Sequence, residues 1–271
     1  MSAFFDSIQN WLIKRLSNRR RLQFGAWLNM LGLKIEIQAR ELVVSMYPEL
    51  EGERYFSDLL VLHRKIQLEL RKQKLEYPHF IFEQGYPYQA LSSLGIYGVR
   101  HTERRFSDYG LIDLIGKDDR VLDIGCNCGF MLIYTCLRTG CSGDGVDINP
   151  YMINIGRHVA AFLGLSQQVN LYAQRFEEFK PQGQYSVIFS FAVHWTDDEQ
   201  SRQDFDRYMA QLHELLTENG LLVFESHVLE FETPDFKEKM KRQRKFFSWS
   251  GSKILFNRQR ALFIMRKKRR S

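Results

Sequence analysis

The spacing of apolar residues differs between the first part of the chain and the rest. Up to about Gln84 they recur three and four positions apart, which places them on one face of an α-helix. Two stretches carry the pattern most clearly: Phe4, Phe5, Ile8, Trp11 and Leu12 near the start, and residues 55–74. Residues 1–84 are therefore predicted to form a helical extension ahead of a main domain over residues 85–271.

From about Asp119 onward, short apolar runs alternate with segments of helical length. The runs cover residues 120–124, 143–146, 169–173, 185–191 and 221–225. Strands that alternate with helices form parallel sheets with right-handed connections. The sequence therefore predicts an α/β fold with a doubly wound, mostly parallel sheet.

Local signals support this prediction for the main domain. Asn149 can cap the helix that follows the second strand, Pro150 suits its first turn and Gly164 can end it. Two later runs, residues 246–255 and 260–265, are predicted to close the sheet as a final antiparallel pair.

The loop after the first predicted strand combines glycines with an acid. The strand ends near Asp123, and Gly125 and Gly129 let the backbone turn sharply and approach a ligand. The second strand ends at Asp147, 24 residues after Asp123, where an acid can accept both hydroxyls of a ribose. Ligands of doubly wound sheets bind beyond the carboxyl ends of the strands. An adenosine that carries a cationic amino-acid tail fits both acids.

A nicotinamide dinucleotide is the main competitor for this site. Its pyrophosphate needs a Gly-x-Gly-x-x-Gly turn at a helix N-terminus, whereas the loop here has three residues between Gly125 and Gly129. The carboxylate of Asp123 would also repel a pyrophosphate. A turn whose glycines pack against their neighbours is the alternative that needs no ligand.

Residues 121–129 resemble the first sequence motif of class I S-adenosylmethionine (SAM) dependent methyltransferases, and Val146-Asp147 resembles the second. The similarity extends over about residues 110–230. It implies a seven-stranded, Rossmann-like sheet, with SAM as the methyl donor, Asp123 near its methionine part and Asp147 on its ribose. The expected cofactor contacts are Asp123, Gly125, Cys126, Asn127, Gly129, Asp147, Ile148, Phe176, Glu177, Phe191 and Arg100.

Two positions depart from the pattern of this family. Asn127 stands where a middle glycine is usual, and Asn enters left-handed backbone conformations more readily than other residues with a side chain. Arg175 stands where relatives often place an acid that contacts the adenine amino group. Adenine recognition is therefore expected from backbone groups of Phe176 or from the side chain of Glu177.

Residues that follow the fourth and fifth predicted strands are the candidates for catalysis. Methyl transfer from a sulfonium is an in-line displacement, so positioning supplies much of the rate, and a base helps when the acceptor loses a proton. His194 is the first candidate for a general base, with Glu225 and His227 to orient it or the acceptor. Trp195 is expected to cover the cofactor or the acceptor. A structural histidine at position 194 remains the alternative.

Residues 85–110, ahead of the first strand, are rich in side chains that bind anions and hydroxyls. Class I enzymes often use this segment as a lid, and the resemblance implies the same here. Arg100 can meet the carboxylate of SAM or an acidic acceptor, because its guanidinium matches planar anions. The expected acceptor contacts are Tyr97, Gln89, Trp195 and His101. A capped surface helix is the alternative that needs no ligand.

Charge is unevenly distributed along the chain. Residues 237–271 hold fourteen Lys and Arg against one acid, a net charge of +13, so the remainder carries −7 within the overall +6. Such a basic end can bind RNA, an anionic membrane or acidic sugars, or it can be a solvated face. The first predicted helix is also basic and can lie on a membrane, although covering the core is its favoured role.

The cysteines and the apolar runs bear on the compartment. All four cysteines lie between Cys126 and Cys141, without the paired spacing of a disulfide framework or a zinc site. No secretory leader is recognisable, and no apolar run approaches the roughly 20 residues of a membrane span. We expect a cytoplasmic protein, at most peripheral to a membrane, without a bound metal.

Three functions are compatible with the sequence. A methyltransferase that acts on a hydroxyl or phosphate of a sugar or glycan-type metabolite is favoured by the acidic main domain and the lid. An RNA methyltransferase is the alternative, indicated by the basic C-terminal end and by a likeness of residues 189–225 to tRNA wobble-uridine methyltransferases. A SAM-binding module that has lost turnover is the third.

Overall fold

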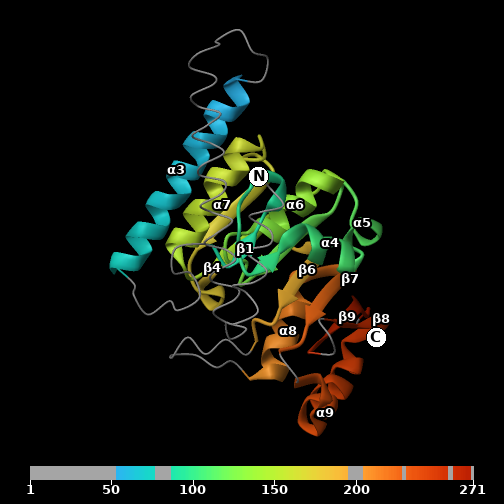
Figure 1. Ribbon diagram of the computed structural model, residues 1–271. Coiled ribbons are helices and arrows are strands. Elements are labelled where there is room, and N and C mark those ends of the chain that lie inside the picture. Colours follow the sequence, from blue (N-terminus) through green and yellow to red (C-terminus); the bar gives the residue numbers. More distant parts are fainter. Residues whose placement is uncertain (1–52, 77–86, 195–203, 228–229, 256–258, 270–271) are drawn as a thin grey trace, which may run out of the picture.

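A computed structural model of the 271-residue chain describes residues 53–76, 87–194, 204–227, 230–255 and 259–269 (Figure 1). The predicted amphipathic helix around residues 4–12 and the predicted cofactor cover Trp195 lie outside the described residues.

A seven-stranded sheet forms the centre of the molecule. Its strands are β3 (Arg120–Ile124), β4 (Ser142–Asp147), β5 (Val169–Ala173), β6 (Tyr185–Phe191), β7 (Leu216–Glu225), β8 (Phe247–Leu255) and β9 (Arg260–Lys267). They lie in the order β5-β4-β3-β6-β7-β9-β8. The pairs from β5 to β7 are parallel, and β9 is antiparallel to both of its neighbours. The predicted doubly wound sheet and its final antiparallel pair are confirmed.

One strand is longer than its apolar run. The run at residues 221–225 predicts a short strand, but β7 begins at Leu216, which pairs with Tyr185 across a register shift. Residues 217–220, which lie between Leu216 and this run, have the composition of a turn, and Asn219 has a φ of 61°. Pairing with β6 therefore keeps in the strand a segment whose sequence alone predicts a loop.

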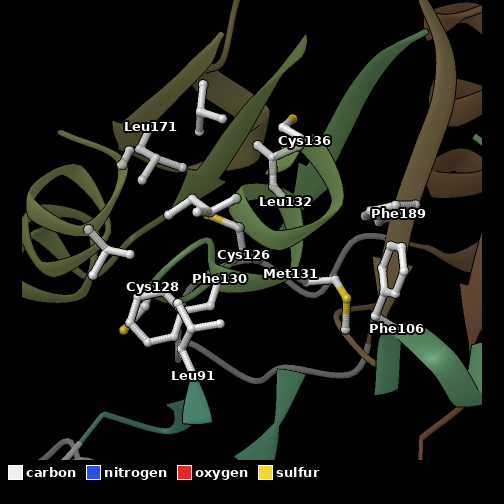
Figure 2. Packing of buried hydrophobic residues seen from close by; sticks show 14 of the residues in the cluster. Leu91, Phe106, Cys126, Cys128, Phe130, Met131, Leu132, Cys136, Leu171 and Phe189 are labelled. Atoms are coloured by element: carbon white, nitrogen blue, oxygen red, sulfur yellow. The ribbon is translucent and has the colours of Figure 1, made fainter. Parts of the chain in front are cut away.

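Helices cover both faces of the sheet. They are α3 (Glu53–Glu76), α4 (Thr102–Tyr109), α5 (Leu111–Leu114), α6 (Phe130–Thr139), α7 (Pro150–Phe162), α8 (Phe205–Leu215) and α9 (Pro234–Arg242). Residues of α3, α4, α6 and α7 pack against one face of the sheet, where they meet Val121 and Phe189. Figure 2 shows part of this cluster. Residues of α8 and α9 pack against the other face through Leu122 and Ile188. Consecutive residues of a strand therefore pack into the hydrophobic clusters on opposite faces of the sheet.

The signals that surround α7 behave as predicted. The side chain of Asn149 accepts hydrogen bonds from the backbone nitrogens of Tyr151 and Met152, and Pro150 is the first helical residue. Beyond the helix, Gly164 has a φ of 72°, a left-handed conformation that suits glycine. This helix begins directly after β4, so its N-terminus lies beside Asp147.

The described part of the N-terminal extension belongs to the same core. Leu62, Ile66 and Leu70 of α3 are buried in the cluster that contains α7, and α3 lies alongside α7 in Figure 1. The side chain of Asn154 donates a hydrogen bond of 3.0 Å to Glu69. The division of the chain at residue 84 stays a prediction. None of the described helices is long and apolar enough to cross a membrane.

Candidate cofactor and active site

The strand order defines the edge at which a ligand can bind. The chain runs outward from β3 to β4 and β5 and then returns to place β6 on the other side of β3. In doubly wound sheets the crevice for ligands opens at this reversal, beyond the carboxyl ends of the strands. We call this edge, which holds the ends of β3, β4, β6 and β7, the cofactor edge.

The glycine-rich loop, residues 125–129, crosses the cofactor edge between β3 and α6. Gly125, Asn127 and Gly129 have φ angles of 63°, 54° and 67°. A Cβ on Gly125 would lie 2.6 Å from the side chain of Val193, and one on Gly129 would lie 2.6 Å from Leu171. Both glycines are therefore required by conformation and by space. Asn127 adopts the left-handed conformation expected for the residue that replaces the usual middle glycine.

Asp123, at the end of β3, is a buried acid with spare hydrogen-bonding capacity. Asp123 is 2% exposed. Its Oδ2 has no hydrogen-bond partner in the part of the chain that the structure describes. Burial raises its pKa to about 8, although Arg105 acts in the opposite direction. A cationic donor would compensate this carboxyl group. The ammonium of the methionine part of SAM has that chemistry.

Asp147, at the end of β4, is held in place by backbone amides. Its Oδ2 accepts a hydrogen bond of 2.8 Å from the nitrogen of Asn127, and its Oδ1 accepts one of 2.9 Å from Asn149. Burial raises the pKa of Asp147, while these amides oppose the increase. A carboxylate has about four lone-pair sites, so this one can still accept the hydroxyls of a ribose.

The segment after β5 returns to the same edge. The nitrogen of Gln174 donates a hydrogen bond of 2.9 Å to the carbonyl of Asp147, and a short 3₁₀ helix, η2 (Phe176–Glu178), follows. Phe176 is half-buried and Glu177 is exposed, while Ile148 next to Asp147 is 40% exposed. The roles predicted for these residues, and for Cys126, stay predictions.

Gln89 requires a correction. It was expected to orient the acceptor, but its Nε2 donates to the carbonyl of Cys126 at 3.0 Å, and its Oε1 accepts from the nitrogen of Phe130 at 2.9 Å. Gln89 is 6% exposed. Its amide group is therefore bound to the glycine-rich loop and is directed away from solvent.

The other lid residues stay predictions. Gln89 lies on β1 (Gln89–Ala90), which pairs in parallel with β2 (Arg100–His101). The Nε of Arg100 donates a hydrogen bond of 3.0 Å to the hydroxyl of Tyr88. Tyr97 is half-buried and His101 is exposed.

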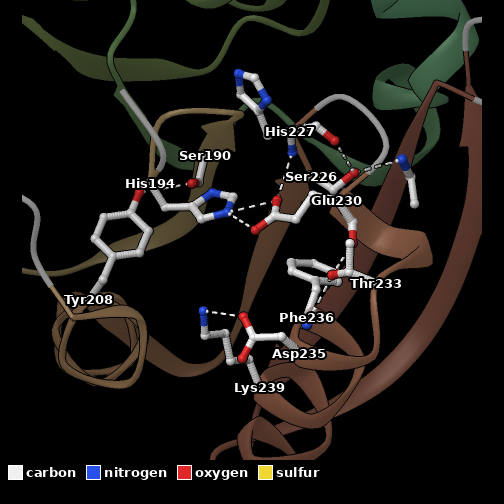
Figure 3. A network of polar contacts seen from close by, with 11 residues as sticks. Ser190, His194, Tyr208, Ser226, His227, Glu230, Thr233, Asp235, Phe236 and Lys239 are labelled. Carbon is white, nitrogen blue, oxygen red and sulfur yellow. Dashed lines mark hydrogen bonds and ion pairs between the residues drawn. The ribbon is translucent and has the colours of Figure 1, made fainter. Parts of the chain in front are cut away.

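His194 also requires a correction. Its Nε2 lies 3.0 Å from both carboxylate oxygens of Glu230, in the 3₁₀ helix η3 (Glu230–Glu232), and its side chain is 3% exposed (Figure 3). The rings of Phe205, Phe224 and Phe236 lie around it. A general base must reach the acceptor. The enclosed, carboxylate-bound imidazole favours the structural role, which was the alternative.

Glu225 is a third correction, because ion pairs occupy its carboxylate. Its Oε2 lies 3.0 Å from an Arg105 nitrogen and accepts from the hydroxyl of Tyr109, while its Oε1 lies 2.5 Å from an Arg260 nitrogen. Burial alone would raise the pKa of Glu225, but the two guanidinium groups lower it below its usual range. This carboxylate stays ionised and joins α4 to β7 and β9.

The partners of these two residues were missed by sequence reasoning. Arg105 lies in α4 and also packs over the ring of Phe191, with 5.2 Å from its guanidinium carbon to the ring centre. Glu230 lies beyond the end of β7. Neither is part of a recognisable motif, and each meets its partner across 36 or more residues of sequence. The expected cofactor contact of Phe191 itself stays a prediction.

His227 differs from His194 in its surroundings. It follows β7 by two residues and is exposed, and its backbone nitrogen donates a hydrogen bond of 2.9 Å to Glu230 (Figure 3). Partial burial, together with the nearby charge of Arg260, lowers the pKa of its imidazole. The neutral form, which can accept a proton, therefore prevails at pH 7.

Several exposed cations of the C-terminal end lie away from the cofactor edge. Arg266 pairs with Leu221, four residues before the end of β7, which is a strand length of about 13 Å. Lys268 lies further along, where its nitrogen donates to Phe246 and its Nζ donates to Arg244 in the 3₁₀ helix η4 (Gln243–Lys245). These residues lie toward the opposite ends of the strands. Lys253 differs, because it pairs with Leu262, the partner of Glu225, and so lies level with the cofactor edge.

Comparison with known proteins agrees with this arrangement. A family model described as a methyltransferase domain matches residues 99–260. No curated protein matches the sequence. Among solved structures, the [4+2]-cyclase SpnF is 12% identical with a TM-score of 0.53, covering 75% of this chain and 93% of its own. The O-methyltransferase segment StiE, residues 942–1257, is 16% identical with a TM-score of 0.50, covering 74% and 82%.

A further similar structure carries a ligand. It is the SAM-dependent methyltransferase of Thiobacillus denitrificans in complex with S-adenosyl-L-homocysteine, 16% identical with a TM-score of 0.45, covering 55% of this chain and 66% of its own. At these identities the likeness concerns the fold. The family match spans more than half of the chain and includes the glycine-rich loop, Asp123 and Asp147. The chain belongs to the class I methyltransferases, and its cofactor is S-adenosylmethionine.

Proposed function

We propose that this methyltransferase acts on an oxygen atom, a hydroxyl or a phosphate, of a small metabolite of the sugar type. One observation carries the proposal. A cluster of exposed cations at the C-terminal end, Arg244, Arg266 and Lys268, of the kind that a nucleic acid would need, lies toward the ends of the strands opposite to Asp123 and Asp147. An acceptor bound at the cofactor edge does not meet this cluster.

The alternative acceptor, RNA, needs a different distribution of charge. Proteins bind nucleic acids largely through several Lys and Arg contacts to phosphates, and these contacts must surround the reacting nucleotide to position it. At the cofactor edge the buried arginines Arg105 and Arg260 are both paired with Glu225. Tyr97, Arg100 and His101, in the segment that contacts the glycine-rich loop through Gln89, have side chains that suit hydroxyls and single anionic groups.

The described residues also suggest how the reaction is supported. Bound SAM supplies a methyl group on a positively charged sulfur. Asp123 would pair with the ammonium, and Asp147 would accept the ribose hydroxyls. His227, as a neutral imidazole, would take the proton of an acceptor hydroxyl as the methyl group is transferred to its oxygen. A phosphate oxygen that is already ionised needs no base.

Incubation of the full chain with methyl-labelled SAM and separate cell fractions tests the proposal. We expect label in polar metabolites, and transfer that changes little between about 50 and 200 mM salt, since few phosphate contacts are involved. Label in the RNA fraction, with transfer that falls steeply over the same range of salt, would instead establish the RNA alternative.

A further inference from the structure

A single side chain from outside the glycine-rich loop binds both ends of that loop. Gln89 donates from Nε2 to the carbonyl of Cys126 at 3.0 Å and accepts at Oε1 from the nitrogen of Phe130 at 2.9 Å. Cys126 is the second residue of the loop, and Phe130 is the first residue of α6. The middle of the loop is held separately, through the bond from Asn127 to Asp147.

These two contacts satisfy groups that the loop cannot satisfy itself. The first amides of a helix lack partners within the helix, and Gly129, at the N-cap position of α6, has no side chain with which to accept from them. The Oε1 of Gln89 supplies the acceptor for Phe130. The carbonyl of Cys126 also accepts from the nitrogen of Gly129 at 2.8 Å, which closes the turn. Loss of the Gln89 amide would leave a buried N–H without its acceptor.

The backbone around Gln89 is itself fixed by short contacts. Its neighbours Ala90 and Leu91 are buried, and Leu91 exchanges two backbone hydrogen bonds with Ile96, of 2.8 and 3.0 Å. A Cβ on Gly98 would lie 2.6 Å from the carbonyl carbon and oxygen of Gln89. Residues 87–98 therefore hold Gln89 rigidly, and they precede the region matched by the family model.

From this geometry we propose that Gln89 is a positioning residue for cofactor binding, which keeps the glycine-rich loop in the conformation that accepts SAM before SAM arrives. Unlike Asp123 and Asp147, Gln89 acts through the backbone of the loop. If the loop leaves this conformation in some of the molecules, the apparent affinity for the cofactor falls in proportion to the fraction that remains competent. The proposal concerns the cofactor and does not depend on the identity of the acceptor.

Two substitutions separate this role from general stability. Gln89→Leu removes both contacts, and Gln89→Glu keeps an acceptor for Phe130 but sets an oxygen against the Cys126 carbonyl. Gln243→Leu is the matched control, because Gln243 is also fully buried and donates to a backbone carbonyl, that of Lys239 at 3.1 Å. It lies in η4, away from the cofactor edge.

Binding of S-adenosylhomocysteine by calorimetry is the first measurement, and amide hydrogen exchange of residues 124–132 without any ligand is the second. We expect both Gln89 variants to bind about tenfold more weakly or worse, since a buried amide is left without its partner. Exchange in the free loop should be faster. The Gln243→Leu control should lower thermal stability and leave affinity and loop exchange unchanged.

The proposal is overturned if a cooperatively folded Gln89 variant binds S-adenosylhomocysteine within twofold of the original protein. It is also overturned if the affinity falls but exchange in the free loop does not change. Should neither Gln89 variant fold, Gly98→Ala gives the decision, because a Cβ there displaces the Gln89 backbone and leaves its amide intact. Weaker binding with faster loop exchange supports the role, and unchanged binding refutes it.

Discussion

Two buried acids near the ends of strands β3 and β7, Asp123 and Glu225, have opposite surroundings. Asp123 keeps an oxygen that has no partner among the described residues, and burial raises its pKa to about 8. Glu225 bonds to Arg105, Arg260 and Tyr109, and the arginines lower its pKa. An acid with spare capacity awaits a ligand, whereas a saturated acid holds the protein together. Both lie at the same edge, so position alone does not separate the roles.

The largest effect is expected from Glu225→Gln. Breaking a buried ion pair leaves uncompensated charge, here on Arg105 and Arg260, and typically lowers the free energy of unfolding by about 3–5 kcal/mol. Urea denaturation monitored by circular dichroism measures the change. If the variant kept its stability and lost only turnover, Glu225 would be catalytic and the contrast with Asp123 would fail.

The two histidines extend the same comparison to catalysis. His227→Gln should slow turnover of a hydroxyl acceptor by about a hundredfold with little change in cofactor affinity, as expected for a lost base. Because its pKa is lowered, the acid limb of the rate profile should fall below pH 6.5. His194→Gln should lower stability by about 1–3 kcal/mol through the loss of its bond to Glu230. Equal turnover of both variants would remove His227 as the base.

Asp123 should exchange a proton when the cofactor binds. Its folded pKa of about 8 means that it is mostly protonated in the free protein at pH 7, and pairing with an ammonium favours the ionised form. Binding of S-adenosylhomocysteine should therefore release up to about one proton, which calorimetry in buffers of different ionisation enthalpy detects. Asp123→Asn should abolish the release and weaken binding by about 1–3 kcal/mol.

The pH dependence of the stability of the free protein gives a second test of the raised pKa of Asp123. A group whose pKa is raised on folding binds its proton more tightly in the folded state, so its contribution to stability is full below pH 4 and declines as the pH rises towards 8. The decline should be smaller in Asp123→Asn. A stability curve that is identical in the two proteins across this range would contradict the assignment.

The smallest effect is expected at the basic end of the molecule. Arg244→Gln combined with Lys245→Gln changes two exposed side chains, and each should alter stability by no more than about 0.5 kcal/mol. Methyl transfer to a small acceptor should be unaffected. If the double variant instead lost methyl transfer to RNA, a single RNA acceptor would have to contact both the cofactor edge and this basic end.

Features set by nearby residues were predictable from the sequence. The strands at residues 120–124, 169–173 and 185–191 coincide with their apolar runs, and the glycine-rich loop needs left-handed conformations that its own residues indicate. The partners of His194, Glu225 and Gln89 were not predictable. Their contacts join residues 36, 120 and 37 positions apart, and a polar residue in one segment does not specify which distant group will meet it.

The position of β9 has a consequence for how the molecule assembles during synthesis. This strand lies between β7 and β8, although it is made after both of them. Until residues 260–267 have left the ribosome, the edge of β7 has no neighbour on that side, and β8 has no strand to pair with. Open strand edges invite association with other chains. Completion of the sheet and of the Glu225–Arg260 ion pair is therefore a late event, most vulnerable in the nascent protein.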